Sequence, residues 1–201
     1  MNNNPLKKNE IIKILKKLKD FNLKTEKINL FKANDRYLSK KIKSLINLPP
    51  FNNSAVDGYA IHDKDINEDK IFKISNRIAA GYEKKNKLKK GEVARIFTGA
   101  KLPINSRTVV MQENIEKKGY YIKINKKPIL GENCRIAGED ISKSQTILDA
   151  GKKINYQNIS LLAAIGRNHI EVRKKLKIGY FTSGNELFNP SKKLFGSKIY
   201  N

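Results

Sequence analysis

The chain lacks the residues that build disulfide-bonded or membrane-spanning proteins. Cys134 is the only cysteine among 201 residues, so no disulfide can form within the chain, and we expect a reducing, cytoplasmic setting. No apolar run approaches the roughly 18 residues that a membrane-spanning helix needs. The N-terminal residues also lack the apolar core of a secretory signal. We therefore expect no membrane partner.

Acidic residues are few. The chain has 19 Asp and Glu and 42 Lys and Arg, which gives a net charge of +23. A charge of this size usually indicates nucleic acid or an anionic membrane surface as partner. Only 7 of these cations are arginine, the residue preferred for bidentate contacts with phosphates and bases. Lys, Asn and Ile, all abundant here, are favoured by A/T-rich codons. We interpret the charge as a solvated lysine surface that attracts small anionic substrates, with salt-sensitive nucleic-acid binding as the alternative.

Several common signatures of catalysis are also missing. The chain contains neither a Gly-Lys-Ser/Thr phosphate-binding loop nor a Gly-x-Gly-x-x-Gly fingerprint. His62 and His169 have no second histidine or cysteine at ligand spacing, so we expect no zinc site. Cys134 has no histidine close to it in the sequence and is interpreted as a small buried apolar side chain.

The N-terminal pattern predicts a helix followed by short strands. Residues 9–21 place Ile and Leu on one face and lysines on the other, which predicts an amphipathic helix with Asn9 as its N-cap. Residues 27–46 alternate less cleanly and predict two short strands around a turn at 33–35.

The rest of the chain changes period once. Short apolar runs broken by turn residues fill 58–147 and predict a small antiparallel barrel or sandwich. Residues 155–165 predict a helix ended by Gly166. A strand at 169–173 and a buried strand at 177–182 are expected to follow.

The most informative segment is Leu-Pro-Pro-Phe-Asn-Asn-Ser-Ala-Val-Asp-Gly-Tyr-Ala at residues 48–60. Its prolines keep the entering chain extended, and Gly58 permits a sharp or left-handed backbone after Asp57. An acidic side chain on such a stiff loop can be aimed at a ligand. Three further segments have the same character: Arg-Ile-Phe-Thr-Gly-Ala at 95–100, Gly-Glu-Asp-Ile at 138–141 and Thr-Ser-Gly-Asn-Glu-Leu at 182–187.

These segments, in this order and spacing, resemble the MoeA family of molybdopterin molybdenumtransferases, which includes the C-terminal domain of gephyrin. Matching text also lies at 102–103, 108–113, 131–135 and 177–182, and the resemblance runs from about residue 27 to residue 201. The resemblance implies a mixed α+β, mainly β fold in three parts. They are an elongated first domain (1–47 and 146–175), an inserted β-barrel-like domain (48–145) and the first strand of a molybdopterin-binding α/β domain (176–201).

MoeA proteins are about twice as long as this chain. The resemblance therefore implies that the chain is the N-terminal half of a longer protein or a truncated form, and we expect the isolated chain to be inactive. A catalytically inactive dimerisation or scaffold module is the alternative from a different class.

The family reaction joins molybdate to adenylylated molybdopterin, forming molybdenum cofactor and releasing AMP, with Mg²⁺ or another divalent cation. Both substrates are anionic, so carboxylates are useful there mainly with a hard cation between them and the substrate. The resemblance assigns three kinds of site residue. They are catalytic Asp57, Thr98 and Glu186; substrate-binding Asp140, Ser54, Gly99 and Arg135; and metal-binding Asp57 and Glu186.

Each of the main site residues also has a purely structural alternative. Asp57 suits a turn that caps itself, and Thr98 suits the end of a strand. Asp140 can cap the segment after it, and Glu186 can satisfy free amides at a helix N-terminus. Asn185 stands where the family usually carries aspartate, which removes one negative charge beside Glu186.

Partners and further contacts also follow from the resemblance. It implies a homodimer, with the molybdopterin adenylyltransferase of the same pathway as a second candidate partner. Arg95 and Lys101 lie in or beside the matched loops and are interpreted as further contacts for anionic substrates, with a solvated surface role as the alternative for Lys101.

Overall fold

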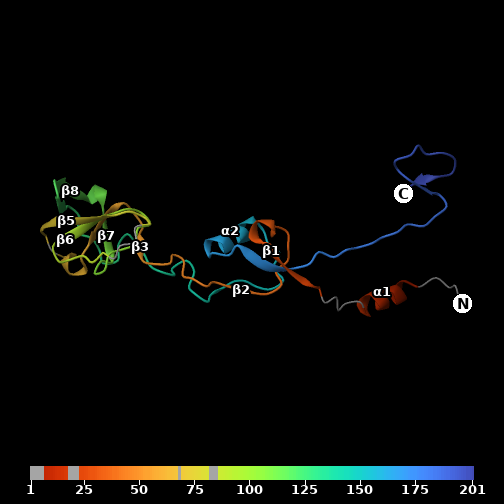
Figure 1. Ribbon diagram of the computed structural model, residues 1–201, viewed down its shortest axis with the longest axis horizontal. Coiled ribbons are helices and arrows are strands. Elements are labelled where there is room, and N and C mark those ends of the chain that lie inside the picture. Colours follow the sequence, from red (N-terminus) through yellow and green to blue (C-terminus); the bar gives the residue numbers. More distant parts are fainter. Residues whose placement is uncertain (1–6, 18–22, 68, 82–85) are drawn as a thin grey trace.

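The structure is a computed structural model that describes residues 7–17, 23–67, 69–81 and 86–201. The chain is mixed α+β and mainly β, as expected. A curled sheet forms one end of an elongated molecule, a smaller α/β part lies in the middle, and helix α1 and a C-terminal loop lie at the other end (Figure 1). Within these ranges no helix has the length and apolar character to cross a membrane.

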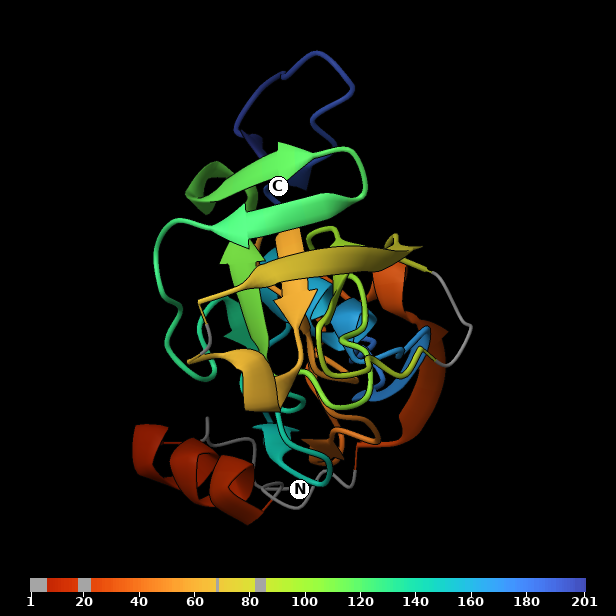
Figure 2. The ribbon, with the colours of Figure 1, turned by 90° about the vertical axis from the view of Figure 1, so that its left-hand side faces the viewer.

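The curled sheet has six strands in the order β7-β4-β6-β5-β9-β8. Its strands are β4 (Gly58–Ile61), β5 (Ile71–Ile78), β6 (Glu92–Ile96), β7 (Thr108–Met111), β8 (Ile115–Lys118) and β9 (Tyr121–Ile124). In Figure 2, β8 and β9 (green) run across the direction of β4 and β7. The expectation of a purely antiparallel arrangement is wrong at one pair, because β5 and β6 are parallel. A long connection rather than a hairpin joins these two strands, as parallel pairing requires.

The central strands of the sheet are buried on both faces, and their sequences explain why. Side chains alternate along a strand, so Tyr59 and Ile61 of β4 pack in one apolar cluster with Phe72, while Ala60 packs in another with Ile96. All four residues of β4 are buried. Such double burial accounts for the apolar composition of the central strands.

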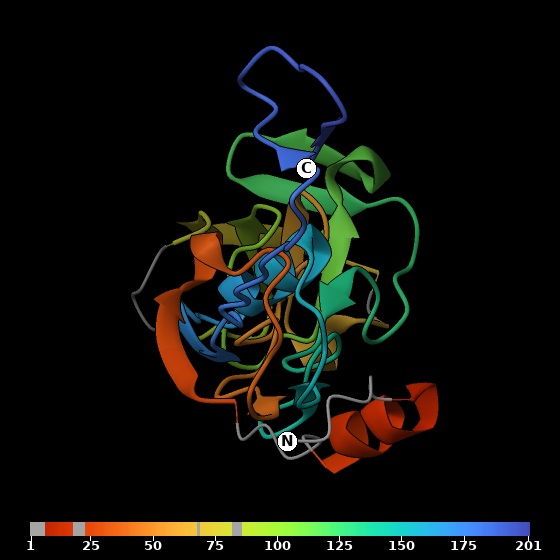
Figure 3. The same cartoon turned by 90° about the vertical axis from the view of Figure 1, so that its right-hand side faces the viewer.

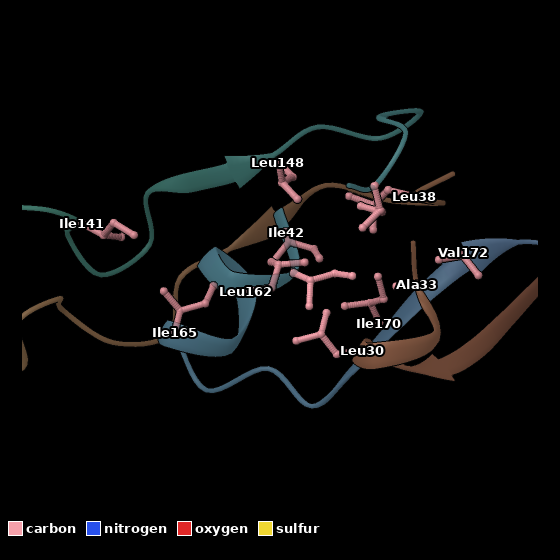
Figure 4. Close-up of a cluster of buried hydrophobic side chains, with 12 residues drawn as sticks. Leu30, Ala33, Leu38, Ile42, Ile141, Leu148, Leu162, Ile165, Ile170 and Val172 are labelled. Carbon is pink, nitrogen blue, oxygen red and sulfur yellow. The ribbon is translucent and has the colours of Figure 1, made fainter. Parts of the chain in front are cut away.

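The middle part has its own core, drawn in Figure 4. It is built by β1 (Thr25–Asn29), the short helix η1 (Leu30–Lys32), β2 (Ile42–Lys43), β11 (Thr146–Leu148), α2 (Tyr156–Ala164) and β12 (His169–Arg173). The predictions of α2 and β12 are confirmed. Asn155 accepts from the amide of Asn158 at 2.9 Å to cap α2, and Gly166 follows the helix with φ +79.

Two passes of the chain connect the middle part to the sheet. The outgoing pass contains β3 (Asn53–Ser54), which pairs antiparallel with β10 (Cys134–Arg135) of the returning pass. A further antiparallel bridge joins Leu48 to Ile141. Residues 48–54 therefore lie beside residues 134–141, two segments far apart in the sequence.

The N-terminal helix begins earlier than the sequence predicts. Helix α1 spans Lys8–Lys17, so Asn9 lies inside the first turn and is not the N-cap. The backbone N–H of Lys7 instead donates to the carboxylate of Glu10 at 2.8 Å. Residues 18–21 of the predicted helix lie outside the described residues. No residue of α1 is buried. Figure 3 views the molecule from the end at which α1 and the C-terminal loop lie, and there α1 (red) and this loop (blue) lie on opposite sides.

The prediction of a buried strand at 177–182 is wrong. This segment has no ladder partner among the described residues, and Phe181 in it is 92% exposed. A strand needs a neighbouring strand for its backbone hydrogen bonds, and the apolar pattern cannot supply one. Only β13 (Leu187–Phe188) and β14 (Ile199–Tyr200) pair beyond this segment, in parallel. The domain limits expected from the resemblance stay a prediction.

Candidate active site

Asp57 and Thr98, two of the predicted catalytic residues, are in direct contact. Asp57 Oδ1 accepts hydrogen bonds from the backbone N–H and from the hydroxyl of Thr98, both at 2.8 Å. The sheet explains the contact, because Gly58 of β4 pairs with Ile96 of β6 in the antiparallel register. The residue before β4 and the residues after β6 must therefore meet where β4 begins and β6 ends.

These hydrogen bonds fix the charge of Asp57. The pKa of the Asp57 carboxyl lies below its usual value because the backbone amide of Thr98 stabilises the carboxylate, with the Thr98 hydroxyl as the second cause and the positive charge of Arg95 as a smaller one. Asp57 is therefore ionised at neutral pH. Its Oδ2 accepts no hydrogen bond from any described residue, so one oxygen holds the loop and the other is open to a ligand.

Replacing Thr98 by valine is expected to raise the pKa of Asp57 toward its ordinary value, since the hydroxyl donor is lost while the amide stays. A carboxyl whose folded-state pKa is depressed contributes stability above its unfolded pKa, and that contribution disappears as the pH falls through the folded pKa. The wild-type chain should thus lose more stability between about pH 4 and pH 2 than Thr98→Val does. Carboxyl carbon NMR titration measures the pKa directly, with Thr98→Ser as the control that keeps a hydroxyl. An unchanged Asp57 pKa in Thr98→Val would contradict the assigned contact.

Arg95 lies beside this pair and is held by several groups. Its guanidinium donates to the carbonyl of Gly58 at 3.2 Å and to the side chain of Gln112 at 2.5 Å. It also lies over two rings, 5.2 Å from the centroid of Tyr59 and 4.8 Å from that of Phe97. Arg95 is thus a fixed cation close to the Asp57 loop.

Arg135 and Asp140, predicted as substrate-binding residues, form an ion pair of 2.6 Å. The Arg135 guanidinium also bonds the carboxylate of Glu139, four residues along the chain. Asp140 and then Glu139 are the main causes that raise the pKa of Arg135. The pKa of Glu139 is lowered, first by the backbone N–H of Ile136 and then by Arg135. The four residues close the loop that returns from the sheet.

Ser54 and Gly99, the other predicted substrate contacts, shape the loops themselves. The Ser54 side chain is fully buried and donates to the carbonyl of Val56 at 2.6 Å, so it is not presented to a ligand. Gly99 has φ +79, which favours glycine, and its N–H donates to the carbonyl of Ser54 at 2.8 Å. Both residues position the segments that carry Asp57 and Thr98.

Glu186 is not brought to this site within one chain. It belongs to the C-terminal loop, which lies at the far end of the molecule from the sheet (Figure 1). Among the residues that the structure describes, no three His, Cys, Asp or Glu side chains converge as metal ligands do. A hard divalent cation needs several oxygen ligands, and the cation site expected at Asp57 and Glu186 stays a prediction.

The architecture is that of solved molybdopterin biosynthesis proteins. The chain superposes with a TM-score of 0.86 on a crystal structure of the MoeA protein of Pyrococcus horikoshii, at 32% sequence identity, covering 95% of this chain and 51% of that one. A second structure of the P. horikoshii protein matches with a TM-score of 0.77 and 30% identity, covering 84% and 46%.

Sequence comparison identifies the family. The family described as the MoeA N-terminal region (domain I and II) matches residues 6–166, and the chain belongs to this family. It is 32% identical over 181 residues to the molybdopterin molybdenumtransferase of Haemophilus influenzae, covering 90% of this chain and 45% of that protein. It is 34% identical over 190 residues to a putative molybdopterin biosynthesis protein of Methanocaldococcus jannaschii, covering 92% and 46%. The chain thus spans about half the length of these relatives, whose names indicate molybdenum cofactor biosynthesis.

Two residues of the site were not predicted from the sequence. Gln112 follows β7 and accepts a hydrogen bond from Arg95 of β6. The sequence feature that could have indicated Gln112 is its place in the matched segment 108–113. Glu139 shares Arg135 with Asp140, and its signal was the spacing of four residues from Arg135. Both hold an arginine beside a predicted site residue rather than forming a separate centre.

Proposed function

We propose that this chain supplies one wall of the active site of a molybdopterin molybdenumtransferase. The full-length protein would join molybdate to adenylylated molybdopterin, forming molybdenum cofactor and releasing AMP. Membership of the MoeA family and the names of the relatives support the pathway.

The observation that carries the proposal is the contact between Asp57 and Thr98. The two residues come from loops 41 positions apart, and the contact leaves a carboxylate that is ionised at neutral pH, with one open oxygen, where β4 begins and β6 ends. A purely structural cap needs only one acceptor oxygen. The fixed Arg95, whose printed partners are a carbonyl and an amide oxygen, adds a cation suited to anionic substrates, whereas Arg135 is already paired with Asp140 and Glu139.

The proposal includes partners and a cation that complete the site. Because Glu186 lies far from Asp57 within one chain, we propose a cytoplasmic homodimer in which Glu186 of one copy faces the Asp57 loop of the other. Mg²⁺ or another divalent cation would bind between carboxylates of the two copies and the substrate. The adenylyltransferase that makes adenylylated molybdopterin is the proposed donor of the substrate.

The test measures molybdenum cofactor formed, and AMP released, by the full-length protein from molybdate and adenylylated molybdopterin. We expect Asp57→Ala to lower the rate by about 100-fold or more, as for the loss of a preorganised charged group in an active site. The matched control is Asp149→Ala, which removes an exposed acid from the middle part of the molecule. Equal rates for Asp57→Ala and the control would refute the site. An inactive wild-type full-length protein would refute the function.

A further inference from the structure

A concave basic pocket lies in the middle part of the molecule, apart from the Asp57 loop. Its volume is about 310 Å³, within the size range of sites for small ligands. Five cationic side chains line it against a single carboxylate, that of Glu171. The cationic residues are Lys27, Lys40, Lys41, Lys43 and Arg167.

The fold gathers these residues from three distant segments. Lys27 of β1 pairs directly with Glu171 of β12, while the neighbouring pair of Ile28 and Ile170 faces the core. Lys27 and Glu171 therefore lie on the face of the ladder that is turned away from the core. The core residues Leu38, Ile42 and Ile170 also line the pocket. His169, two residues before Glu171 on the same strand, also lines it.

The segment from Ser39 to Lys43 forms the opposite side of the pocket and is tied at both ends. The backbone N–H of Ser39 donates to the Glu171 carbonyl at 3.0 Å, and the Arg167 guanidinium donates to the Lys43 carbonyl at 3.2 Å. Ile42 is buried, so Lys41 and Lys43 on either side of it both point outward. The lysines are therefore presented by a fixed backbone.

The charge of the pocket is not balanced by the protein. Glu171 is already engaged, by Lys40 at 2.6 Å and by the Ser39 hydroxyl at 3.3 Å. Within the described part of the chain, no carboxylate lies at ion-pair distance from Lys41, Lys43 or Arg167. Like charges held close together repel, and a bound anion would relieve that repulsion.

One further polar group at the pocket lacks a partner. Arg167 Nε is buried and donates no hydrogen bond to any residue that the structure describes. Because this atom has almost no accessible surface, an anion in the pocket cannot reach it, and the lysine side chains supply the charge of the site.

We propose that this pocket binds a small polyphosphate anion, of the kind carried by a nucleoside diphosphate, at a site separate from the Asp57 loop. Lysines bind phosphates as point charges, whereas base reading favours exposed arginines, and the one arginine here is partly buried against Lys43. A small anion matches the concave shape better than a nucleic-acid strand does. The proposal does not depend on the proposed transferase function.

The test is calorimetric titration of the 201-residue chain with inorganic pyrophosphate at about 50 mM salt, where surface charges are only partly screened. The double substitution Lys41→Gln with Lys43→Gln removes two exposed charges from the pocket. At roughly 1 kcal/mol for each exposed ion contact, we expect a loss of affinity of about 25-fold. The matched control, Lys117→Gln with Lys118→Gln, removes the same net charge from edge strand β8 and should change the affinity less than about twofold.

Three results would overturn the proposal. Wild-type chain that binds no pyrophosphate lacks the site. Equal losses in the pocket variant and the control would show general attraction to the lysine surface. The third result is that the pocket variant still binds duplex DNA and that pyrophosphate does not compete with the DNA. This result would favour the nucleic-acid interpretation instead. Far-UV circular dichroism of both variants confirms that they remain folded, and Lys27→Gln serves as a second pocket variant.

Discussion

Gly58→Ala is expected to lower the free energy of unfolding by about 3 kcal/mol, at the upper end of the usual cost of overpacking. A Cβ at this position would lie 2.1 Å from the carbonyl oxygen of Val110 and 2.9 Å from the side chain of Val109. Real Cβ atoms do not approach a backbone oxygen so closely, so strands β4 and β7 would have to separate. The variant should also displace Asp57, the preceding residue.

The physical reason differs from the one that the sequence suggested. Gly58 has no positive φ, so a left-handed backbone is not what requires glycine here. The requirement is the close approach of two neighbouring strands. Denaturant unfolding followed by circular dichroism measures the effect, with Gly179→Ala as the control, since Gly179 has open space around it and no positive φ. A control within about 0.5 kcal/mol of wild type is expected, and a similarly small loss for Gly58→Ala would contradict the strand spacing.

Local patterns in the sequence predicted the elements whose stability is local. Helix α2 has its cap, its apolar face and its terminal glycine within a dozen residues, and it forms as expected. Strands β6 and β7 are buried apolar runs bounded by turn residues, and they also form. The segment 177–182 has the same apolar character, yet it stays exposed. A strand forms only beside a partner strand, and the segment's own sequence does not determine whether one is there.

The candidate site depends on strand register, which the local sequence does not contain. The motifs predicted that Asp57, Thr98, Arg135 and Asp140 matter, but not which of them meet. The pairing of β4 with β6 brings Asp57 to Thr98, and the chain reversal after β10 brings Arg135 to Asp140. Glu186 shows the converse, since an equally clear motif lies apart from the others within this chain.

Phe72→Ala is expected to destabilise the sheet by about 3–5 kcal/mol, the usual cost of emptying a buried phenylalanine site. Phe72 is fully buried and is among the largest side chains of the core. Its cluster shares no residue with the core of the middle part, which Leu162 anchors. We therefore expect the loss to fall on the sheet alone, because within the described residues the two paired passes connect the two parts.

Amide hydrogen exchange tests this separation, since it reports the opening of each part of a structure. In Phe72→Ala, protection should fall by two to four orders of magnitude, the equivalent of about 3–5 kcal/mol, in β4, β5 and β6, and stay unchanged in β1 and β12. Leu162→Ala should produce the reverse pattern, because its fully buried side chain belongs to the other core. Phe181→Ala is the matched control, since that side chain is 92% exposed. If either core variant exposed both parts equally, the two parts would unfold as one unit. The connecting passes would then couple them more strongly than their few backbone pairs indicate.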